Sequence, residues 1–118
     1  MLKHIFLTLT LILLIGVQTS CAATVTFAWD EKPVTEVWTF VRIYERVGTD
    51  DSYTYVKVAE VSGNVTQASA LGVSAGVHTY FARSVFVNGT VEIESFDSNV
   101  VTTTVRPGTP TNLKFIIP

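Results

Sequence analysis

The sequence has few of the residues from which catalytic and metal sites are built. It contains one cysteine, Cys21, and two histidines, His4 and His78, among 118 residues. No disulfide can form within the chain, and a general base at His78 would need an orienting partner that the sequence does not indicate. Gly-x-Ser-x-Gly, Walker and His-Glu-x-x-His motifs are missing. We therefore expect no enzyme activity, no metal and no cofactor, and a structural role for His78.

Clusters of one charge are missing as well. The formal net charge is −2, and the lysines and arginines are dispersed along the chain. Nucleic-acid binding depends on clustered basic residues, so nucleic acid is not an expected partner. The acidic pairs Asp30-Glu31 and Asp50-Asp51 lie at different turns, whereas a calcium site needs about six or more converging oxygens.

One long apolar run is present, at the N-terminus. Lys3 and His4 precede residues 5–17, IFLTLTLILLIGV, and a small, polar stretch leads to Ala22. This order is typical of an export signal that is cleaved after Ala22, and the run is shorter than the roughly 20 apolar residues of a membrane span. We expect residues 1–22 to be a signal peptide. Lipidation of Cys21 is the alternative, because residues 18–21 loosely resemble a bacterial lipobox, and it would anchor the protein to a membrane.

After residue 22 the sequence favours β-strands. Val, Thr and aromatic residues are frequent, and turn residues recur about every ten positions, which indicates an antiparallel sandwich or barrel. Strands are expected at residues 24–30, 38–47, 53–61, 65–71, 78–87 and 99–105, and alternation places one set of large side chains inside. The residues expected inside are Val25, Phe27, Trp29, Val41 and Ile43.

Aromatic residues also lie on the opposite face of one strand. If Val41 and Ile43 point inward, then Trp38, Phe40 and Tyr44 point outward, and Tyr53 and Tyr55 of the next strand could adjoin them. Exposed aromatic patches mark interaction sites. The alternative is that Phe40 and one or two others are core residues.

The strand at residues 78–87 is followed by Asn88-Gly89, the strongest hairpin signal in the chain. It predicts a type I′ turn with positive φ at both central residues. An irregular return then leads to the strand at residues 99–105.

Together these segments resemble a fibronectin type III domain. The matching residues are Val25-Thr26-Phe27-Ala28-Trp29-Asp30, Arg42-Ile43-Tyr44, Leu71, Gly76, Tyr80, Gly89, Glu94-Ser95 and Ser98-Asn99-Val100. The resemblance implies an immunoglobulin-like β-sandwich of about seven strands over residues 23–106. It also implies that Leu71 and Tyr80 belong to the core at the corner that leads into the strand at 78–87.

The family normally has a strand before the one that carries the tryptophan, and removal of residues 1–22 would leave none. The C-terminal stretch TPTNLKFII, from Thr109 to Ile117, resembles such an opening strand. An unpaired strand edge is normally covered, so residues 107–118 are either an edge-covering strand, in the same chain or in a neighbouring copy, or a tail.

The expected function is that of an exported, non-catalytic module. It would bind a protein or a glycan at a cell surface, in the periplasm, or on a virion if the gene is viral. The alternative is an accessory, carbohydrate-binding or spacer unit of a carbohydrate-active enzyme system. Fold alone does not decide between these.

Overall fold

A computed structural model of the chain describes residues 11–16, 22–49 and 52–116. They form strands, turns and loops, and no helix that could cross a membrane occurs among them. The all-β class expected from the sequence is confirmed. The strands within the described ranges are β1 (Leu11–Gly16), β2 (Ala23–Trp29), β3 (Phe40–Thr49), β4 (Ser52–Ser62), β5 (Gln67–Val73), β6 (Gly76–Asn88), β7 (Val91–Glu94) and β8 (Val101–Val105).

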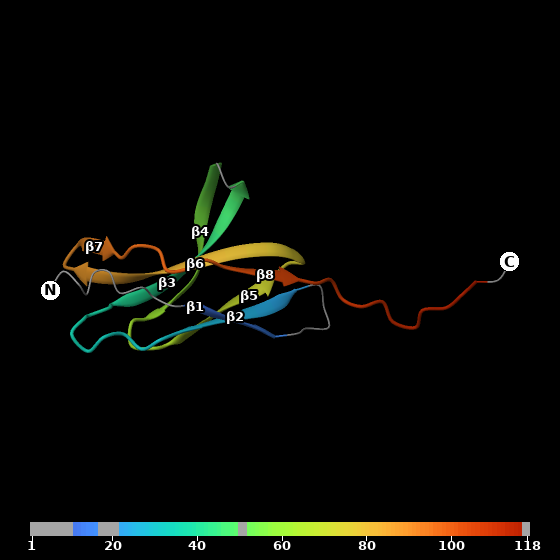
Figure 1. Ribbon diagram of the computed structural model, residues 1–118, viewed down its shortest axis with the longest axis horizontal. Helices are drawn as coiled ribbons and strands as arrows, with labels where there is room; N and C mark the ends of the chain where they lie inside the picture. The colour runs from blue at the N-terminus through green and yellow to red at the C-terminus, as the bar shows by residue number, and fades with distance from the viewer. Residues whose placement is uncertain (1–10, 17–21, 50–51, 117–118) are drawn as a thin grey trace.

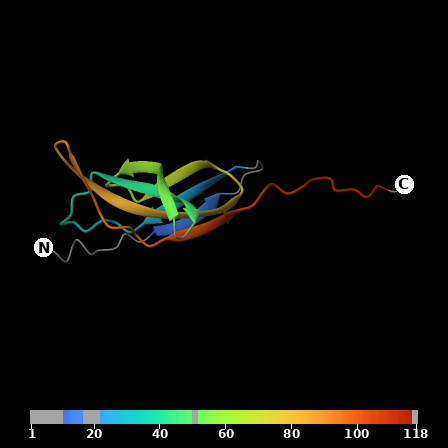
Figure 2. The ribbon, with the colours of Figure 1, turned by 90° about the horizontal axis from the view of Figure 1, so that it is seen from above.

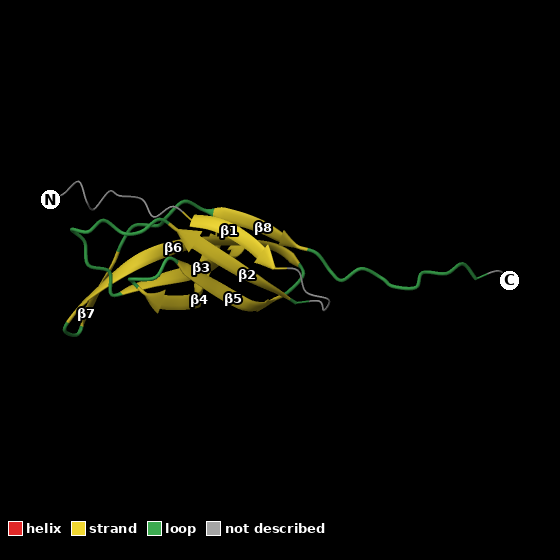
Figure 3. Cartoon of the chain, turned by 90° about the horizontal axis from the view of Figure 1, so that it is seen from below, coloured by secondary structure: helices red, strands yellow, loops and turns green. Residues whose placement is uncertain are grey.

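The strands pair antiparallel in two sheets that face each other (Figures 1 and 3). The smaller sheet has the order β1-β2-β5. The larger has the order β4-β3-β6-β7, with β8 also paired to β6. β6 is the longest strand, with 13 residues, and it pairs with β3 along one edge and with β8 and then β7 along the other. It therefore holds the larger sheet together.

The core lies between the sheets because β2 turns every second residue inward, with the burial pattern that period-2 alternation predicts. The ring of Phe27 meets that of Tyr80 edge to face, with 4.8 Å between the centroids. Aromatic contacts of this kind add to the free energy gained by burial. Of the residues expected in the core, the buried ones are Val25, Phe27, Trp29, Val41, Ile43 and Tyr80.

The expectation for Leu71 is wrong, because its side chain is 78% exposed. Ala68 and Ala70 are the inward residues of β5, so the residue that follows them points to solvent. Gly72 has φ of +65°, and the register with β2 shifts at this point. This irregularity turns Val73, rather than Leu71, back into the core.

The turn after β6 also differs from the expected form. The hairpin is present, but Asn88 pairs with Val91, so the central residues are Gly89 and Thr90. Gly89 has φ of +64°, whereas Asn88 and Thr90 do not have positive φ. Positive φ at the first central residue alone is the pattern of a type II′ turn, not of type I′. Asn88 therefore ends β6, and residues 91–94 form β7 within the stretch expected to be an irregular return.

Residues 95–100 run beside β6 without forming a regular strand. Two serine hydroxyls take the place of backbone carbonyls as acceptors for N–H groups of β6. The Ser98 hydroxyl accepts a hydrogen bond from the backbone N–H of Ala82 at 2.8 Å. Ser95 does the same for the N–H of Ser84 at 3.0 Å. Asn99 bonds through its side chain to the N–H and carbonyl of Leu11. Ser95 and Ser98 thus join residues 95–100 to β6, and Asn99 joins them to β1.

The free edge of β2 is covered by β1, which lies within the segment expected to be an export signal. The register runs from Leu11 opposite Trp29 to Gly16 opposite Thr24. The C-terminal residues 106–116 do not cover this edge. They contain no strand, and the chain there leads away from the body in Figures 1 and 2. In this structure the C-terminal segment is therefore a tail, while Cys21 lies outside the described residues.

The hydrogen bond from the Ala82 N–H to the Ser98 hydroxyl leads to a first prediction. Ser98→Ala should lower the free energy of unfolding by about 1–3 kcal/mol, because it leaves the N–H of the fully buried Ala82 without a partner. Chemical denaturation measures this change. Ser95→Ala is the matched control, since its bond lies at an exposed position, and it should cost clearly less. Equal losses in the two variants would contradict the explanation.

Candidate binding surface

The β3–β4 hairpin extends beyond the body of the protein. β3 pairs with β6 only from Phe40 to Glu45, whereas its pairing with β4 continues to the end of the strand. Residues 45–49 of β3 and 52–56 of β4 therefore form a ribbon, which has no third strand beyond Glu45 and projects from the sheets in Figure 1. An isolated two-stranded hairpin is only marginally stable in water, so contacts at its base must hold this one in place.

The ribbon carries exposed apolar residues on both faces. Tyr53 is 38% exposed and Tyr55 is 46% exposed, and alternation along β4 puts them on one face. Val47 and Val56 are 49% and 52% exposed, and the register puts them on the other. The guanidinium of Arg46 lies over the Tyr53 ring, 4.4 Å from its centroid. This arrangement fixes the ring without burying it.

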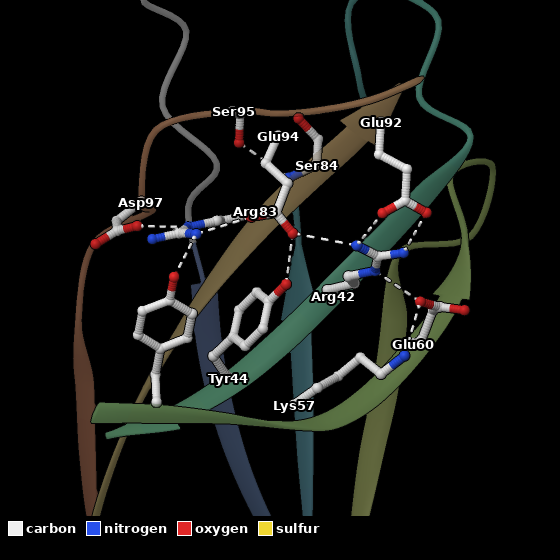
Figure 4. Close-up of polar contacts among 11 residues, drawn as sticks. Arg42, Tyr44, Lys57, Glu60, Arg83, Ser84, Glu92, Glu94, Ser95 and Asp97 are labelled. Carbon is white, nitrogen blue, oxygen red and sulfur yellow. Dashed lines mark hydrogen bonds and ion pairs between the residues drawn. The ribbon is translucent and has the colours of Figure 1, made fainter. Parts of the chain in front are cut away.

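The base of the ribbon is held by a charged network on the outer face, which is the face of the larger sheet turned away from the core. Two arginines organise the network, and the first of them is Arg42 of β3 (Figure 4). Its two terminal nitrogens donate to the two oxygens of Glu92 at 3.1 and 3.0 Å, and its Nε donates to Glu60 at 2.7 Å. Glu94 accepts a further bond at 3.2 Å. Arg42 therefore links β3 to β4 and to β7.

Arg83 of β6 forms the second centre of the network. It donates to Glu94 at 2.8 Å and to Asp97 at 2.7 Å. Its guanidinium also lies within 5.4 Å of the ring centroids of Tyr44, Tyr55 and Phe81. Charge and aromatic packing thus meet at one side chain, and the cation–π contacts add to its ion pairs.

Glu94 is shared by both arginines and by the hydroxyl of Tyr44, which donates to it. Burial alone would raise the pKa of Glu94, but the bonds from Tyr44, Arg83 and Arg42 hold it below its ordinary value. The pKa of Tyr44 is raised to about 12, by burial and by its bond to the Glu94 carboxylate. The pKa of Glu60 is lowered chiefly by its bond from Arg42. These carboxylates therefore stay ionised at neutral pH.

The expected aromatic patch is only partly present. The prediction that Trp38 belongs to the patch is wrong. β3 begins after Trp38, and the indole ring packs against the core, with Nε1 donating to Glu36 at 2.9 Å. Tyr44 does lie on the outer face but is 7% exposed, because Tyr55 and Arg83 cover it. Phe40 is half-buried, with Arg42 over its ring. Of the five residues expected to form the patch, Tyr53 and Tyr55 are exposed.

A cleft of about 300 Å³ lies elsewhere, lined by residues of β3, β4, β5 and β6. His78 is bonded there at both ring nitrogens, to Glu45 and to the carbonyl of Ser74, each at 2.8 Å. Tyr80 also lines the cleft, and its buried hydroxyl has no hydrogen-bond partner among the described residues. Burial, and then the charge of Glu45, raise the pKa of Tyr80 to about 12. His78 thus joins β6 to β3 and to the corner before β6.

The polar groups of the outer face are largely bonded to one another. Arg42 and Arg83 are both bonded to carboxylates, and no group of three or more His, Cys, Asp or Glu able to hold a metal occurs among the described residues. A scan against models of protein families finds no match to the chain, and a search of curated proteins finds no significant relative.

The network of Arg42 and Arg83 with their carboxylates is not predicted from the sequence, although Arg42 follows the expected alternation. Arg42 lies between the inward Val41 and Ile43, so an outward position was implied. Which carboxylates it meets depends on the pairing of β3 with β4 and of β6 with β7, because Glu60 and Glu92 are 18 and 50 residues away along the chain. That information is not in any local pattern.

The shared carboxylate leads to a prediction on acid stability. A lowered pKa means that Glu94 stabilises the fold above its ordinary value of about 4.5, and that this contribution is lost as the pH falls through the folded-state pKa. Glu94→Gln should therefore cost about 1 kcal/mol at pH 7 and much less at about pH 3. Chemical denaturation at both pH values measures it. An equal cost at both would contradict the ionic role, and Glu31→Gln, an exposed control, should have no effect.

His78 leads to the opposite pH dependence. Burial alone would lower its pKa, but the bonds to Glu45 and to the Ser74 carbonyl raise it above its ordinary value. Its stabilising contribution is therefore full below about pH 6.5 and is lost as the pH rises through the raised pKa. The melting temperature of the wild type should fall relative to that of His78→Gln between about pH 6 and pH 8.5. A constant difference over this range would show that the imidazolium contributes nothing.

Proposed function

We propose that the chain is an exported, non-catalytic module of the fibronectin type III kind, which binds a protein partner at a cell or virion surface through the β3–β4 ribbon. The observation that carries this proposal is the ribbon itself, with Tyr53, Tyr55, Val47 and Val56 exposed on its two faces. Solvent-exposed apolar residues gathered on one projecting element are typical of interaction sites.

Two further features support the proposal. The two antiparallel sheets are of the architecture that fibronectin type III domains share with immunoglobulin domains. The network of Arg42 and Arg83 holds the base of the ribbon in one geometry, so less conformational entropy is lost on binding. Tyrosine and arginine are also the residues enriched at binding hot spots.

The test compares two variants of matched chemistry. Tyr53→Ser/Tyr55→Ser alters the ribbon, and Val91→Ser/Phe96→Ser alters residues that are 57% and 72% exposed outside it. Binding of each purified protein to intact producing cells or particles is measured by titration, and a glycan array is probed in parallel. Circular dichroism and thermal melting show whether each variant is folded.

We expect the ribbon variant to bind the surface at least about tenfold more weakly, since tyrosine hot spots contribute about 2 kcal/mol or more, and the control variant to bind as the wild type does. Equal binding by both variants, or loss in the control alone, would overturn the assignment of the ribbon. Binding to glycans that disappears in the ribbon variant would favour the carbohydrate-binding function instead, because tyrosine rings also stack on sugars.

A further inference from the structure

The edge of β2 that β1 covers is built as a receptor for one extended strand. β1 supplies Leu11, which is 3% exposed, to the core cluster. The backbone N–H of Leu11 donates to the side-chain oxygen of Asn99 at 2.9 Å, and the Asn99 amide donates to the Leu11 carbonyl at 3.4 Å. These bonds are to backbone atoms, so Asn99 can hold any residue at this position. The register places Leu11, Leu13 and Ile15 opposite Trp29, Phe27 and Val25.

Export would empty this receptor. The export step of the proposed function, cleavage after Ala22, removes all of β1. It leaves one edge of β2 unpaired along residues 24–29, while the other edge stays paired with β5. It also removes Leu11 from the core. An open edge beside an incompletely filled core is the situation that strand addition relieves.

The C-terminal tail carries a sequence that matches the lost strand. Residues 11–15 read LILLI, and residues 113–117 read LKFII, so apolar residues occupy the same alternate positions. Leu113 is 88% exposed and Phe115 is 97% exposed, which is unfavourable for residues of this size. The charged residue within residues 113–117, Lys114, corresponds to Ile12, which is 52% exposed. An outward position of this kind accepts a lysine.

Geometry favours a tail from a second copy over the chain's own tail. β8 ends beside the start of β6, at the end of the molecule where β2 begins. A strand laid in the direction of β1 must begin at the opposite end, beside Trp29. Residues 106–112 span at most about 25 Å when extended, and β2 alone is about 20 Å long, so almost nothing remains for the reversal. In Figures 1 to 3 the tail leads away from the body along its long axis.

We propose that the exported protein assembles head to tail, with residues 113–117 of one copy replacing β1 on the β2 edge of the next. Leu113 takes the place of Leu11 opposite Trp29, and Phe115 lies opposite Phe27. The two surfaces of such a contact differ, so it does not close by a twofold axis and extends into chains. This inference rests on the export step of the proposed function.

The test uses the full chain expressed with its own N-terminal segment and recovered after export. Intact mass gives the first residue, and sedimentation velocity gives the size over a range of concentrations. Three proteins are compared: the wild type, Leu113→Asp/Phe115→Asp, and Lys114→Asp. None of the altered residues contacts the body of its own chain in the structure, since each is exposed on the tail. The variants should therefore not disturb the folding of the single copy.

We expect proteins that begin at Ala23, and concentration-dependent chains for the wild type and for Lys114→Asp. The double variant should need at least about a hundredfold higher concentration to assemble, because burial of Leu and Phe side chains contributes about 1.5–3 kcal/mol each. A peptide of residues 107–118 should shorten the chains formed by the wild type.

The contrary outcomes are distinct. A wild type that begins at Ala23 and remains monomeric overturns the strand exchange while leaving the proposed export intact. Equal assembly of the double variant also overturns it, because another surface would then be responsible. A recovered protein that retains residues 1–22 overturns the export step and this inference with it. Binding of the ribbon to its partner is measured separately and is unaffected by any of these results.

Discussion

The edge-to-face contact of Phe27 with Tyr80 joins the smaller sheet to the larger one. Both side chains are fully buried, and around them the alternating residues of β2 and β3 complete the core. Tyr80 lies on β6, and β3, β7 and β8 all pair with β6. The position of the outer face and of the ribbon therefore follows from how β6 is fixed against β2, since burial of these side chains is the main stabilising contribution in a domain of this size.

The outer face shows how a strand can serve two purposes through its two faces. On β3, Val41 and Ile43 fill the core, while Arg42 between them organises the carboxylates of β4 and β7. Exposed ion pairs contribute little to stability one by one. Here they are shared and bidentate, and they hold strands that lack a packed layer above them. The consequence is a stiff base from which the β3–β4 ribbon projects with its aromatic residues exposed.

The edges of the smaller sheet raise a different problem. A sandwich must protect the backbone of its outermost strands, and the edge of β2 is protected by β1, which lies within the segment that we predict to be an export signal. A run of Leu and Ile fits both the predicted signal, which needs a short apolar stretch, and an edge strand beside the core. Leu113 and Phe115 of the tail repeat this apolar pattern, and in the assembly proposed above they protect the same edge in a neighbouring copy.

The sequence by itself determined β2 to β6 and β8 and most of their inward residues, whereas β1 and β7 lie in stretches expected to be a signal peptide and an irregular return. Val25, Phe27, Trp29, Val41 and Ile43 follow period-2 alternation, a local property that survives any arrangement of the sheets. Local patterns also placed most strand ends within about two residues.

Only the tertiary structure decided what depends on pairing and register. The glycine bulge that turns Leu71 outward, the packing of Trp38 on the core, and the partners of Arg42 and Arg83 all arise from strands far apart in the chain. The physical reason is that alternation fixes which face a side chain occupies, whereas its neighbours on that face are set by hydrogen-bonded register between strands.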